Sequence, residues 1–420
     1  MIGTDLPDRL TNTGAVVRRA PDSTVPGGHP PDWLVEPGSL AGLVVAVGLL
    51  NAAGIRWRVD ALGRNWGYDD ARVPEPGVIL RLARLDRLDL DPELGLATVQ
   101  PGVTFARLKA ALDDTRAPFR LPAPGSGPHT SVLGNALDRG LLAGLGEREQ
   151  HCRDFLVLAR DGTLSRLDWT GYEDDRVRRA LPYPAGPHRR GSVFQTGGHG
   201  PVVVELTHVL PAAVPYTAPL VLLAGPEPTE ALLRCWRELL LQRLVNGSLL
   251  QPPTRRRIQG VVTTHDGLVL HLTVGAGSRP MLGAIVAEVR RIAGQHGLRV
   301  ALDAAGPPDD LRVIDGRADQ PDAVAQSPVG LEWHTTCLPF DPALVVAYWR
   351  ASQEEPALTD GPWTLRPLDS RALVWLAPLT YRKDDPASLA DLRRRGAAFD
   401  RVREAFGLPS YRQGGLRAPR

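Results

Sequence analysis

The chain has 420 residues, and 43% of them are hydrophobic, which is enough material for two domains with sizeable cores. The formal net charge is +2 with acidic and basic residues interspersed, so electrostatics give no reason to expect nucleic acid or a membrane surface as a partner. The three cysteines, Cys152, Cys235 and Cys337, lie far apart, which indicates neither a disulfide framework nor a metal site. No signal pattern opens the chain and its apolar runs are too short to cross a bilayer, so we expect a cytoplasmic protein.

Residues 1–30 are rich in Pro, Gly, Asp and Thr, which predicts an irregular amino-terminal arm. A helix follows, because Ser39 can cap an apolar pattern of helical spacing that Gly54 ends. Short apolar runs bounded by Gly and Pro then alternate with a second helical pattern at 103–112, which favours an α+β domain over residues 31–212. Its strands are expected at 56–59, 78–80, 97–100, 155–159, 163–166 and 201–210.

The order and length of the predicted elements change after residue 212. Strand patterns now alternate with longer helical patterns, whose apolar positions recur every three or four residues. We therefore expect a second domain over residues 213–420, in which helices cover one face of a sheet. Its strands are expected at 220–223, 267–274, 298–302, 363–366 and 372–376, and its helices at 232–240, 282–292 and 389–406.

Three glycine-containing stretches mark candidate ligand-binding loops. The first, Gly63-Arg-Asn-Trp-Gly-Tyr68, allows close approach of the backbone to a ligand, and its amides are placed to receive a pyrophosphate. The second is Pro101-Gly-Val-Thr104, and the third, residues 131–140, offers backbone amides at a helix start. Each stretch alone is as typical of a plain turn, and none is a Rossmann or P-loop motif.

In this order and at this spacing, the three stretches resemble the FAD-binding domain of the vanillyl-alcohol oxidase and 4-cresol dehydrogenase flavoprotein family. The resemblance implies the p-cresol methylhydroxylase (PCMH) type of α+β fold, in which FAD lies extended between two α+β subdomains. It also implies a cap domain, an antiparallel sheet covered by helices, over the reactive flavin ring. The cofactor-binding residues that it implies are Gly63, Arg64, Asn65, Trp66, Gly67, Pro101, Gly102, Val103, Thr104, Ser131, Gly134, Asn135 and Val202.

A fourth stretch, Leu408-Pro-Ser-Tyr-Arg412, resembles the Pro-Pro-Tyr-Arg segment of the same family. In phenol-oxidising members this Tyr and Arg bind the substrate phenolate together with the Tyr of the first loop, which implies such a role for Tyr411, Arg412 and Tyr68. Two hydroxyl donors and a guanidinium would hold a phenolate and lower its pKa. His129 lies near the third stretch and is a candidate base or hydrogen-bond donor, although a structural loop histidine fits equally well.

The chain departs from the family pattern at several positions. Asp69 and Asp70 stand where glycines are usual, and two carboxylates there would repel a pyrophosphate unless they point away. Ser126 stands where the family has an Asp near flavin N5. Residues 145–151 form a wall of the substrate site that in phenol-oxidising relatives often carries a Tyr and an Asp-His pair. Residues 371–375 offer no His or Tyr to tether the cofactor, so we expect FAD to bind non-covalently. The chain also stops soon after Arg412.

Three hypotheses follow from these residues. The first is an FAD-dependent oxidoreductase that oxidises a para-substituted phenol or related aromatic small molecule, in a pathway of bacterial secondary metabolism. The second keeps the fold but has lost or altered the redox function, as a cyclase, isomerase or lyase with FAD absent or only structural. The third is a non-catalytic subunit, which retention of Tyr411 and Arg412 argues against. The resemblance further implies a homodimer.

Overall fold

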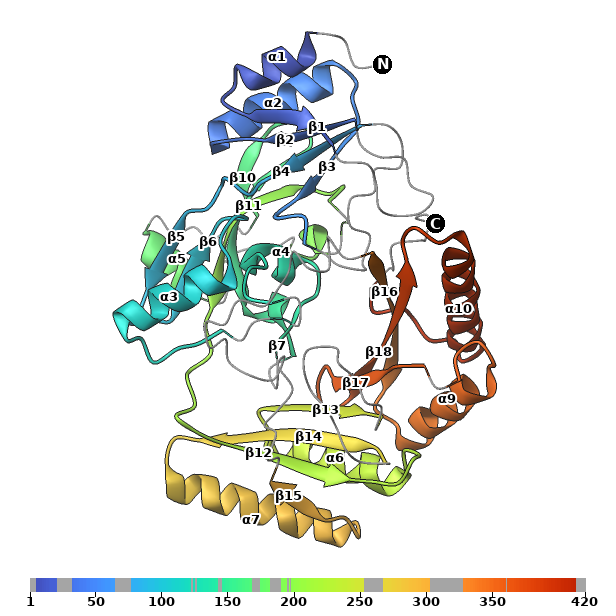
Figure 1. The fold of residues 1–420 in the computed structure, drawn as a ribbon. Helices are drawn as coiled ribbons and strands as arrows, with labels where there is room; N and C mark the ends of the chain where they lie inside the picture. The colour runs from blue at the N-terminus through green and yellow to red at the C-terminus, as the bar shows by residue number, and fades with distance from the viewer. Residues whose placement is uncertain are drawn as a thin grey trace.

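The computed structural model describes residues 5–20, 32–64, 77–121, 124, 127–142, 146–167, 174–181, 190–194, 196, 198–252, 267–302, 328–359 and 361–412. Figure 1 shows three main sheets with their helices, and the chain passes through them in order. We call them the first subdomain (α1 to β4), the second subdomain (β5 to β11) and the cap (β12 to α10).

The first subdomain is a four-stranded sheet, in the order β1-β2-β4-β3, with helices on one side. Helix α2 (Leu40–Ala52) begins at Ser39, whose hydroxyl accepts a hydrogen bond from the Gly42 amide at 3.0 Å. It ends before Gly54, which adopts a left-handed φ of 64°, so both predicted signals are confirmed. The remaining elements are α1 (Leu6–Thr11), β1 (Val16–Arg19), β2 (Trp33–Glu36), β3 (Trp57–Asp60) and β4 (Val78–Arg81).

The expectation of an irregular arm is wrong for residues 5–20, which contain α1 and β1. Leu6 and Leu10 of α1 are buried in the same core as Leu43 and Val47 of α2. Strand β1 pairs antiparallel with β2 along its full length. The reason is that two leucines one helical turn apart bury enough apolar surface to order a segment whose composition is typical of a loop.

The second subdomain is a five-stranded antiparallel sheet in the order β10-β9-β11-β6-β5. Thr104 caps α3 by accepting a hydrogen bond from the Arg107 amide at 3.1 Å, so this helix begins slightly later than the pattern predicted. Its strands are β5 (Leu88–Asp91), β6 (Leu96–Val99), β9 (Cys152–Leu158), β10 (Leu164–Arg166) and β11 (Val202–Val209). Its other elements are α3 (Phe105–Thr115), α4 (Val132–Leu137), β7 (Leu141–Leu142), β8 (Gly146–Glu147), η1 (Arg148–His151), α5 (Asp175–Ala180) and η2 (Arg190–Val193).

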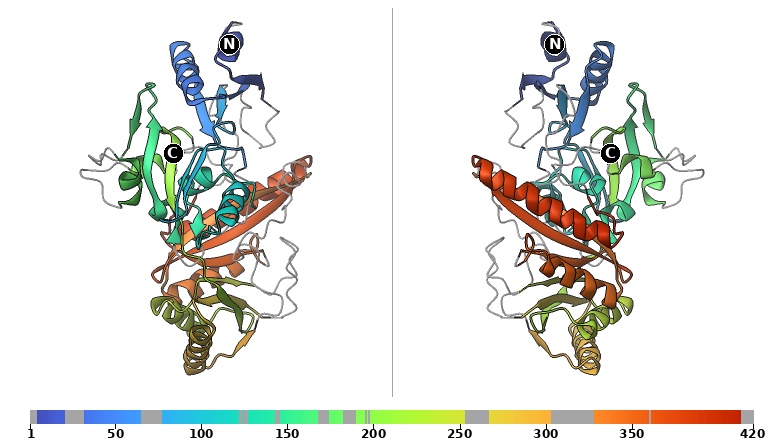
Figure 2. Two further views of the ribbon diagram at one scale, coloured as in Figure 1. Left: turned by 90° about the vertical axis from the view of Figure 1, so that its left-hand side faces the viewer. Right: turned by 90° about the vertical axis from the view of Figure 1, so that its right-hand side faces the viewer.

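The cap is one seven-stranded antiparallel sheet in the order β15-β12-β14-β13-β17-β18-β16. Figures 1 and 2 show its helices on one face, while the other face is turned toward the two subdomains, which confirms the predicted fold class. The strands are β12 (Tyr216–Leu223), β13 (Gly247–Gln251), β14 (Val269–Ala276), β15 (Val300–Leu302), β16 (Val329–Pro339), β17 (Thr364–Pro367) and β18 (Ala372–Arg382). The helices are α6 (Glu230–Leu241), α7 (Arg279–Gln295), α9 (Pro342–Glu354) and α10 (Pro386–Ala405).

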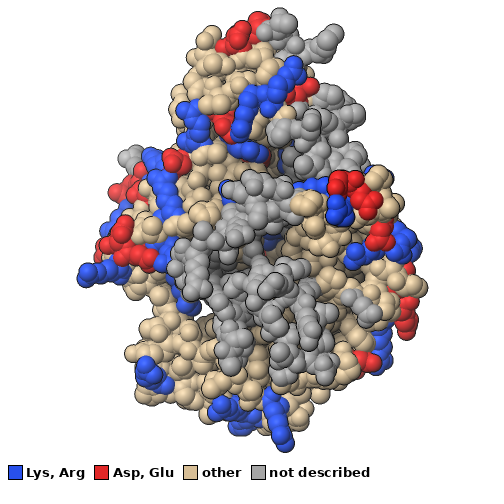
Figure 3. All heavy atoms as spheres, in the orientation of Figure 1, with Lys and Arg blue, Asp and Glu red and all other residues tan. Residues whose placement is uncertain are grey.

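The predicted boundary between residues 212 and 213 falls in the connection from β11 to β12. We keep as a proposal that residues 31–212 and 213–420 are the two domains of the chain. None of the helices in the described part of the chain is long and apolar enough to cross a membrane. On the face shown in Figure 3, basic and acidic side chains lie side by side over the described residues.

The side chains of β16 face two different parts of the molecule, because successive side chains of a strand point to opposite sides of the sheet. On the helix side, the Thr336 hydroxyl lies 2.8 Å from the Tyr348 hydroxyl of α9, and the His334 ring packs edge-on against Phe399 of α10. On the other side, Thr335 and Cys337 point toward the subdomains, and Thr335 contacts the carboxyl-terminal segment. The strand therefore joins the cap core to the candidate site.

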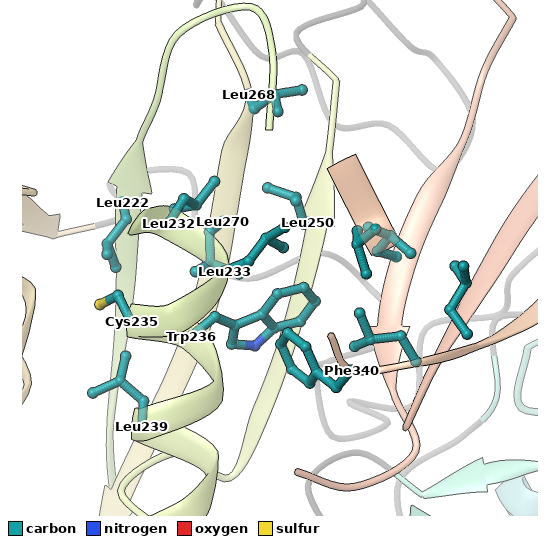
Figure 4. Packing of buried hydrophobic residues seen from close by; sticks show 14 of the residues in the cluster. Leu222, Leu232, Leu233, Cys235, Trp236, Leu239, Leu250, Leu268, Leu270 and Phe340 are labelled. Atoms are coloured by element: carbon teal, nitrogen blue, oxygen red, sulfur yellow. The ribbon is translucent and has the colours of Figure 1, made fainter. Parts of the chain in front are cut away.

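Trp236 anchors the cap core at the contact of α6 with the sheet (Figure 4). Its side chain is fully buried, and the indole N–H donates a hydrogen bond to the Ser248 hydroxyl at 2.8 Å. The ring of Phe340 packs against it edge-to-face, with 5.3 Å between the ring centroids.

We expect Trp236→Ala to lower the free energy of unfolding by about 3–5 kcal/mol, because it leaves a large cavity and an unpaired Ser248 hydroxyl. Urea unfolding followed by far-ultraviolet circular dichroism measures the change. The control is Met281→Ala on α7, where the side chain is 57% exposed, and it should alter stability by less than about 0.5 kcal/mol. Equal stabilities of the two variants would contradict this assignment of the core.

Candidate functional site

The second and third sequence motifs meet at the start of α4. The Ser131 hydroxyl accepts a hydrogen bond from the Gly134 amide at 2.9 Å and donates one to the Pro101 carbonyl at 2.6 Å. The amide of Val132 donates to the Val103 carbonyl at 2.9 Å. Ser131 therefore caps the helix and fixes it to the 101–104 loop at the same time.

The first motif lies against the same helix. A side-chain carbon built at Gly134 would lie 3.0 Å from the Cβ of Ala61, so α4 approaches the 61–64 segment as closely as a glycine permits. Gly63 has a left-handed φ of 66° and packs on the guanidinium of Arg81, which is itself paired with Asp60 at 2.9 Å. Packing on Arg81 and Ala61 therefore already requires these two glycines, and it places the 61–64 backbone beside the start of α4. Backbone amides at such loops are typical ligands of the pyrophosphate of an extended dinucleotide.

The remaining predicted cofactor residues have different surroundings. Gly102 lies on the Ala83 carbonyl, where a Cβ would come within 2.2 Å, so packing inside the second subdomain already requires this glycine. The Asn135 side-chain oxygen is buried and has no hydrogen-bond partner among the described residues, which leaves an acceptor available to a cofactor N–H. Val202 is 2% exposed at the start of β11 and packs in the core of the first subdomain. Arg64 follows Gly63 and is half-buried, and the predicted Asn65, Trp66, Gly67 and Tyr68, with Asp69 and Asp70, lie outside the described residues.

A loop at residues 198–200 runs beside β3, where the Val59 amide donates a hydrogen bond to the Gly198 carbonyl at 3.0 Å. The pKa of His199 is lowered by burial and by the guanidinium groups of Arg58 and Arg160. This histidine is therefore neutral at physiological pH, in a positively charged part of the amino-terminal half.

Tyr411 reaches from the carboxyl-terminal segment into the second subdomain. Its hydroxyl donates a hydrogen bond to the Arg139 carbonyl at 2.6 Å, and the Arg139 guanidinium covers the ring at 4.2 Å from its centroid. Arg139 also donates to the Tyr411 carbonyl at 3.2 Å. Burial raises the pKa of Tyr411, and the nearby Glu147 carboxylate raises it further, so the hydroxyl keeps its proton.

Arg412 is held by contacts with both halves of the chain. Its guanidinium pairs with the Asp138 carboxylate at 3.0 Å, at the end of α4. Its amide donates to the Thr335 hydroxyl at 3.0 Å, and its carbonyl accepts hydrogen bonds from Thr335 and Ser410. The structure therefore brings Tyr411 and Arg412 together at the carboxyl-terminal end of α4, and the amino-terminal end of the same helix is fixed to the 101–104 loop.

His129 lies in the loop just before α4 and is half-buried. Backbone hydrogen bonds fix the loop to α3, from the Phe105 amide to the Thr130 carbonyl at 3.2 Å and from the Ala106 amide to the Pro128 carbonyl at 2.8 Å. Its role as a base or donor stays a prediction.

Sequence reasoning missed three residues that contact the tail: Asp138, Arg139 and Glu147. Asp138 and Arg139 belong to the third motif, but nothing in the local pattern links them to residues more than 270 positions away. The 145–151 segment did point to Glu147, because polar residues stand there in place of the Tyr and the Asp-His pair that line this side of the site in other family members.

We expect Gly134→Val to weaken FAD binding by about tenfold or more, because the added side chain pushes α4 away from Ala61. FAD released by acid precipitation, measured against protein, quantifies the loss. Gly283→Ala on α7, where a Cβ meets no atom within 4 Å, is the control and should keep its FAD. Full FAD content in Gly134→Val would contradict the contact between these two motifs as a cofactor cradle.

Comparisons with known proteins agree with this arrangement. The family described as FAD binding domain matches residues 31–168. A 1'-carboxy-chondrochloren decarboxylase of Chondromyces crocatus is 26% identical over 389 residues, covering 82% of this chain and 68% of the relative. The 4-cresol dehydrogenase [hydroxylating] flavoprotein subunit of Pseudomonas putida is 31% identical over 143 residues, covering 33% of this chain and 27% of the relative.

The solved structure of p-cresol methylhydroxylase with substrate bound superposes with a TM-score of 0.81. The superposition covers 97% of this chain and 85% of that chain, at 16% sequence identity. The resemblance seen in the sequence is therefore confirmed: the chain contains an FAD-binding domain and has the PCMH-type fold of the vanillyl-alcohol oxidase and 4-cresol dehydrogenase flavoproteins.

Proposed function

We propose that the protein is an FAD-dependent oxidoreductase that oxidises a para-substituted phenol or a related aromatic small molecule. The observation that carries this proposal is the convergence of Tyr411 and Arg412 on the end of α4, beside the loops that fit the cofactor. The names of two similar proteins, a 4-cresol dehydrogenase subunit and a p-cresol methylhydroxylase, support a phenolic substrate.

In this proposal the chain's own residues bind and orient the aromatic hydroxyl. Arg412 attracts the oxygen electrostatically, and Tyr411 donates a hydrogen bond once its hydroxyl turns from the Arg139 carbonyl toward the substrate. Tyr68 would supply a second donor, and His129 a base or donor at the other end. As the phenol ionises, electron density moves to the para carbon and weakens the C–H bond next to the ring. Bound FAD would supply the hydride acceptor at flavin N5.

The cofactor itself is proposed to bind without a covalent link. Residues 371–375, of which 372–375 begin β18, include no histidine or tyrosine. The cofactor would be held by Gly63, Gly134 and the neighbouring backbone amides, and by the unsatisfied Asn135 oxygen.

We expect Tyr411→Phe combined with Arg412→Ala to weaken the binding of 4-cresol by about a hundredfold, because a hydroxyl donor and a cation are lost. Titration calorimetry measures the affinity, and acid-extracted FAD should stay at the wild-type ratio. Arg401→Ala, whose side chain is 63% exposed on α10, is the matched control and should bind as the wild type does. An unchanged affinity in the double variant would remove Tyr411 and Arg412 from the substrate site.

Decarboxylation is the second candidate, favoured by a relative whose name is that of a decarboxylase and whose match covers 82% of this chain. The same site accommodates it chemically. Loss of hydride from the carbon next to the ring gives a quinone methide, and a carboxylate on the neighbouring carbon leaves as CO2, with its bonding electrons forming an alkene. A non-redox lyase, with FAD only structural, would release CO2 without losing a hydride. A secondary-metabolite substrate suits both versions.

A single probe separates these reactions. We expect anaerobic enzyme incubated with 3-(4-hydroxyphenyl)propanoate to bleach its flavin absorbance as the substrate is oxidised. Equal amounts of CO2 and reduced flavin would identify oxidative decarboxylation, which yields 4-vinylphenol. Reduced flavin without CO2 would leave oxidation alone, and CO2 without bleaching would identify the non-redox alternative. Neither signal, with 4-ethylphenol also inert, would contradict a phenol-oxidising function.

A further inference from the structure

Glu147 is packed into one unit with Arg139 and Tyr411. It is 8% exposed, and one of its carboxylate oxygens accepts a hydrogen bond from the Arg139 guanidinium at 2.6 Å. The same guanidinium lies over the Tyr411 ring, and the Tyr411 hydroxyl is bonded to the Arg139 carbonyl. An acidic side chain therefore stands directly behind the hydroxyl that the proposed function assigns to the substrate.

Further charged groups lie near Glu147, Arg139 and Tyr411. The Glu149 carboxyl is hydrogen-bonded to Glu147, and burial together with that neighbour raises its pKa. Arg148 is fully buried near Tyr411, and burial lowers its pKa to about 9, which leaves it charged at neutral pH. Arg412 is paired with Asp138, and the Cys337 thiol, whose pKa burial raises, lies near Arg139. The guanidinium groups of Arg139, Arg148 and Arg412 thus lie near the carboxylates of Asp138 and Glu147. The raised pKa of Glu149 favours its neutral form.

We propose that Glu147 opposes the ionisation of an aromatic hydroxyl bound beside Tyr411, so that the bound phenol ionises at a higher pH than the surrounding guanidinium groups alone would set. This inference rests on the proposed function. A hydroxyl hydrogen-bonded to Tyr411 lies about two hydrogen bonds from Glu147, and its ionisation would place a second anion next to that carboxylate. Arg139 alone would favour the phenolate, and Glu147 cancels its charge. Turnover then rises with pH, as more of the bound phenol ionises.

The test uses 4-nitrophenol, whose ionised form absorbs visible light, bound to the FAD-containing enzyme. Difference absorption spectra over a range of pH give the midpoint at which half of the bound probe is ionised. Glu147→Gln should lower it by about one pH unit, because the Arg139 charge is no longer cancelled. FAD content, measured on the same samples, should not change.

Two further variants separate charge from packing. Arg139→Gln should move the midpoint in the opposite direction, whereas general damage to the site would move both variants the same way. Glu147→Asp keeps the charge and should restore the wild-type midpoint. Glu93→Gln is the matched control, since its side chain is 80% exposed and paired with Arg176, and it should have no effect.

Equal midpoints in the wild type and Glu147→Gln would overturn the inference while leaving the phenol site intact. Shifts of the same sign in Glu147→Gln and Arg139→Gln would overturn it as well. If Glu147→Gln failed to fold, Arg139→Gln and Glu147→Asp would still decide the sign. A wild-type enzyme that did not bind 4-nitrophenol at all would instead contradict the proposed phenol site.

Discussion

The site depends on one constraint: five residues at the end of the described chain must be fixed to two different parts of the molecule. The Cys337 amide donates a hydrogen bond to the Pro409 carbonyl at 2.9 Å, and the Thr335 hydroxyl accepts one from the Arg412 amide. Strand β16 therefore sets the position of residues 408–412. From there, Tyr411 and Arg412 reach Arg139 and Asp138 at the end of α4. Because these polar groups are buried or half-buried, each requires its partner, and a shift of either half would leave several unsatisfied.

The alternation of side chains along β16 lets one strand serve stability and the site independently. His334 and Thr336 pack under the helices, and Thr335 and Cys337 face the subdomains. A register slip of one residue would exchange the two sets, placing Thr336 in the site and Thr335 in the core. Strand β16 pairs with β18 at eleven positions, and this long antiparallel pairing fixes the register of β16. The pairing therefore determines which side chains of β16 face the substrate side of the molecule.

Local signals in the sequence predicted the local features well. Ser39 and Gly54 were identified from capping and helix-end patterns, residues 131–140 as a helix start, and α6 from the spacing of its apolar residues. Strand β16 was missed because Glu332, His334 and Thr336 are polar residues on its buried face, which hides the apolar alternation. The three glycine motifs of the candidate site were found, but Arg139, Asp138 and Glu147 were not. Their partners are in the tail, and a contact of that sequence separation leaves no periodic pattern.

That separation has a kinetic consequence. Tyr411 and Arg139 are 272 residues apart, and the intervening chain includes the whole cap. Contacts between such distant residues form late in folding, after the elements between them have been synthesised and packed. The two subdomains that carry the FAD-binding loops are complete in sequence only at the end of β11, residue 209, before the cap begins. The amino-terminal half is therefore synthesised before the cap, and the substrate side, which needs Tyr411 and Arg412, is assembled last.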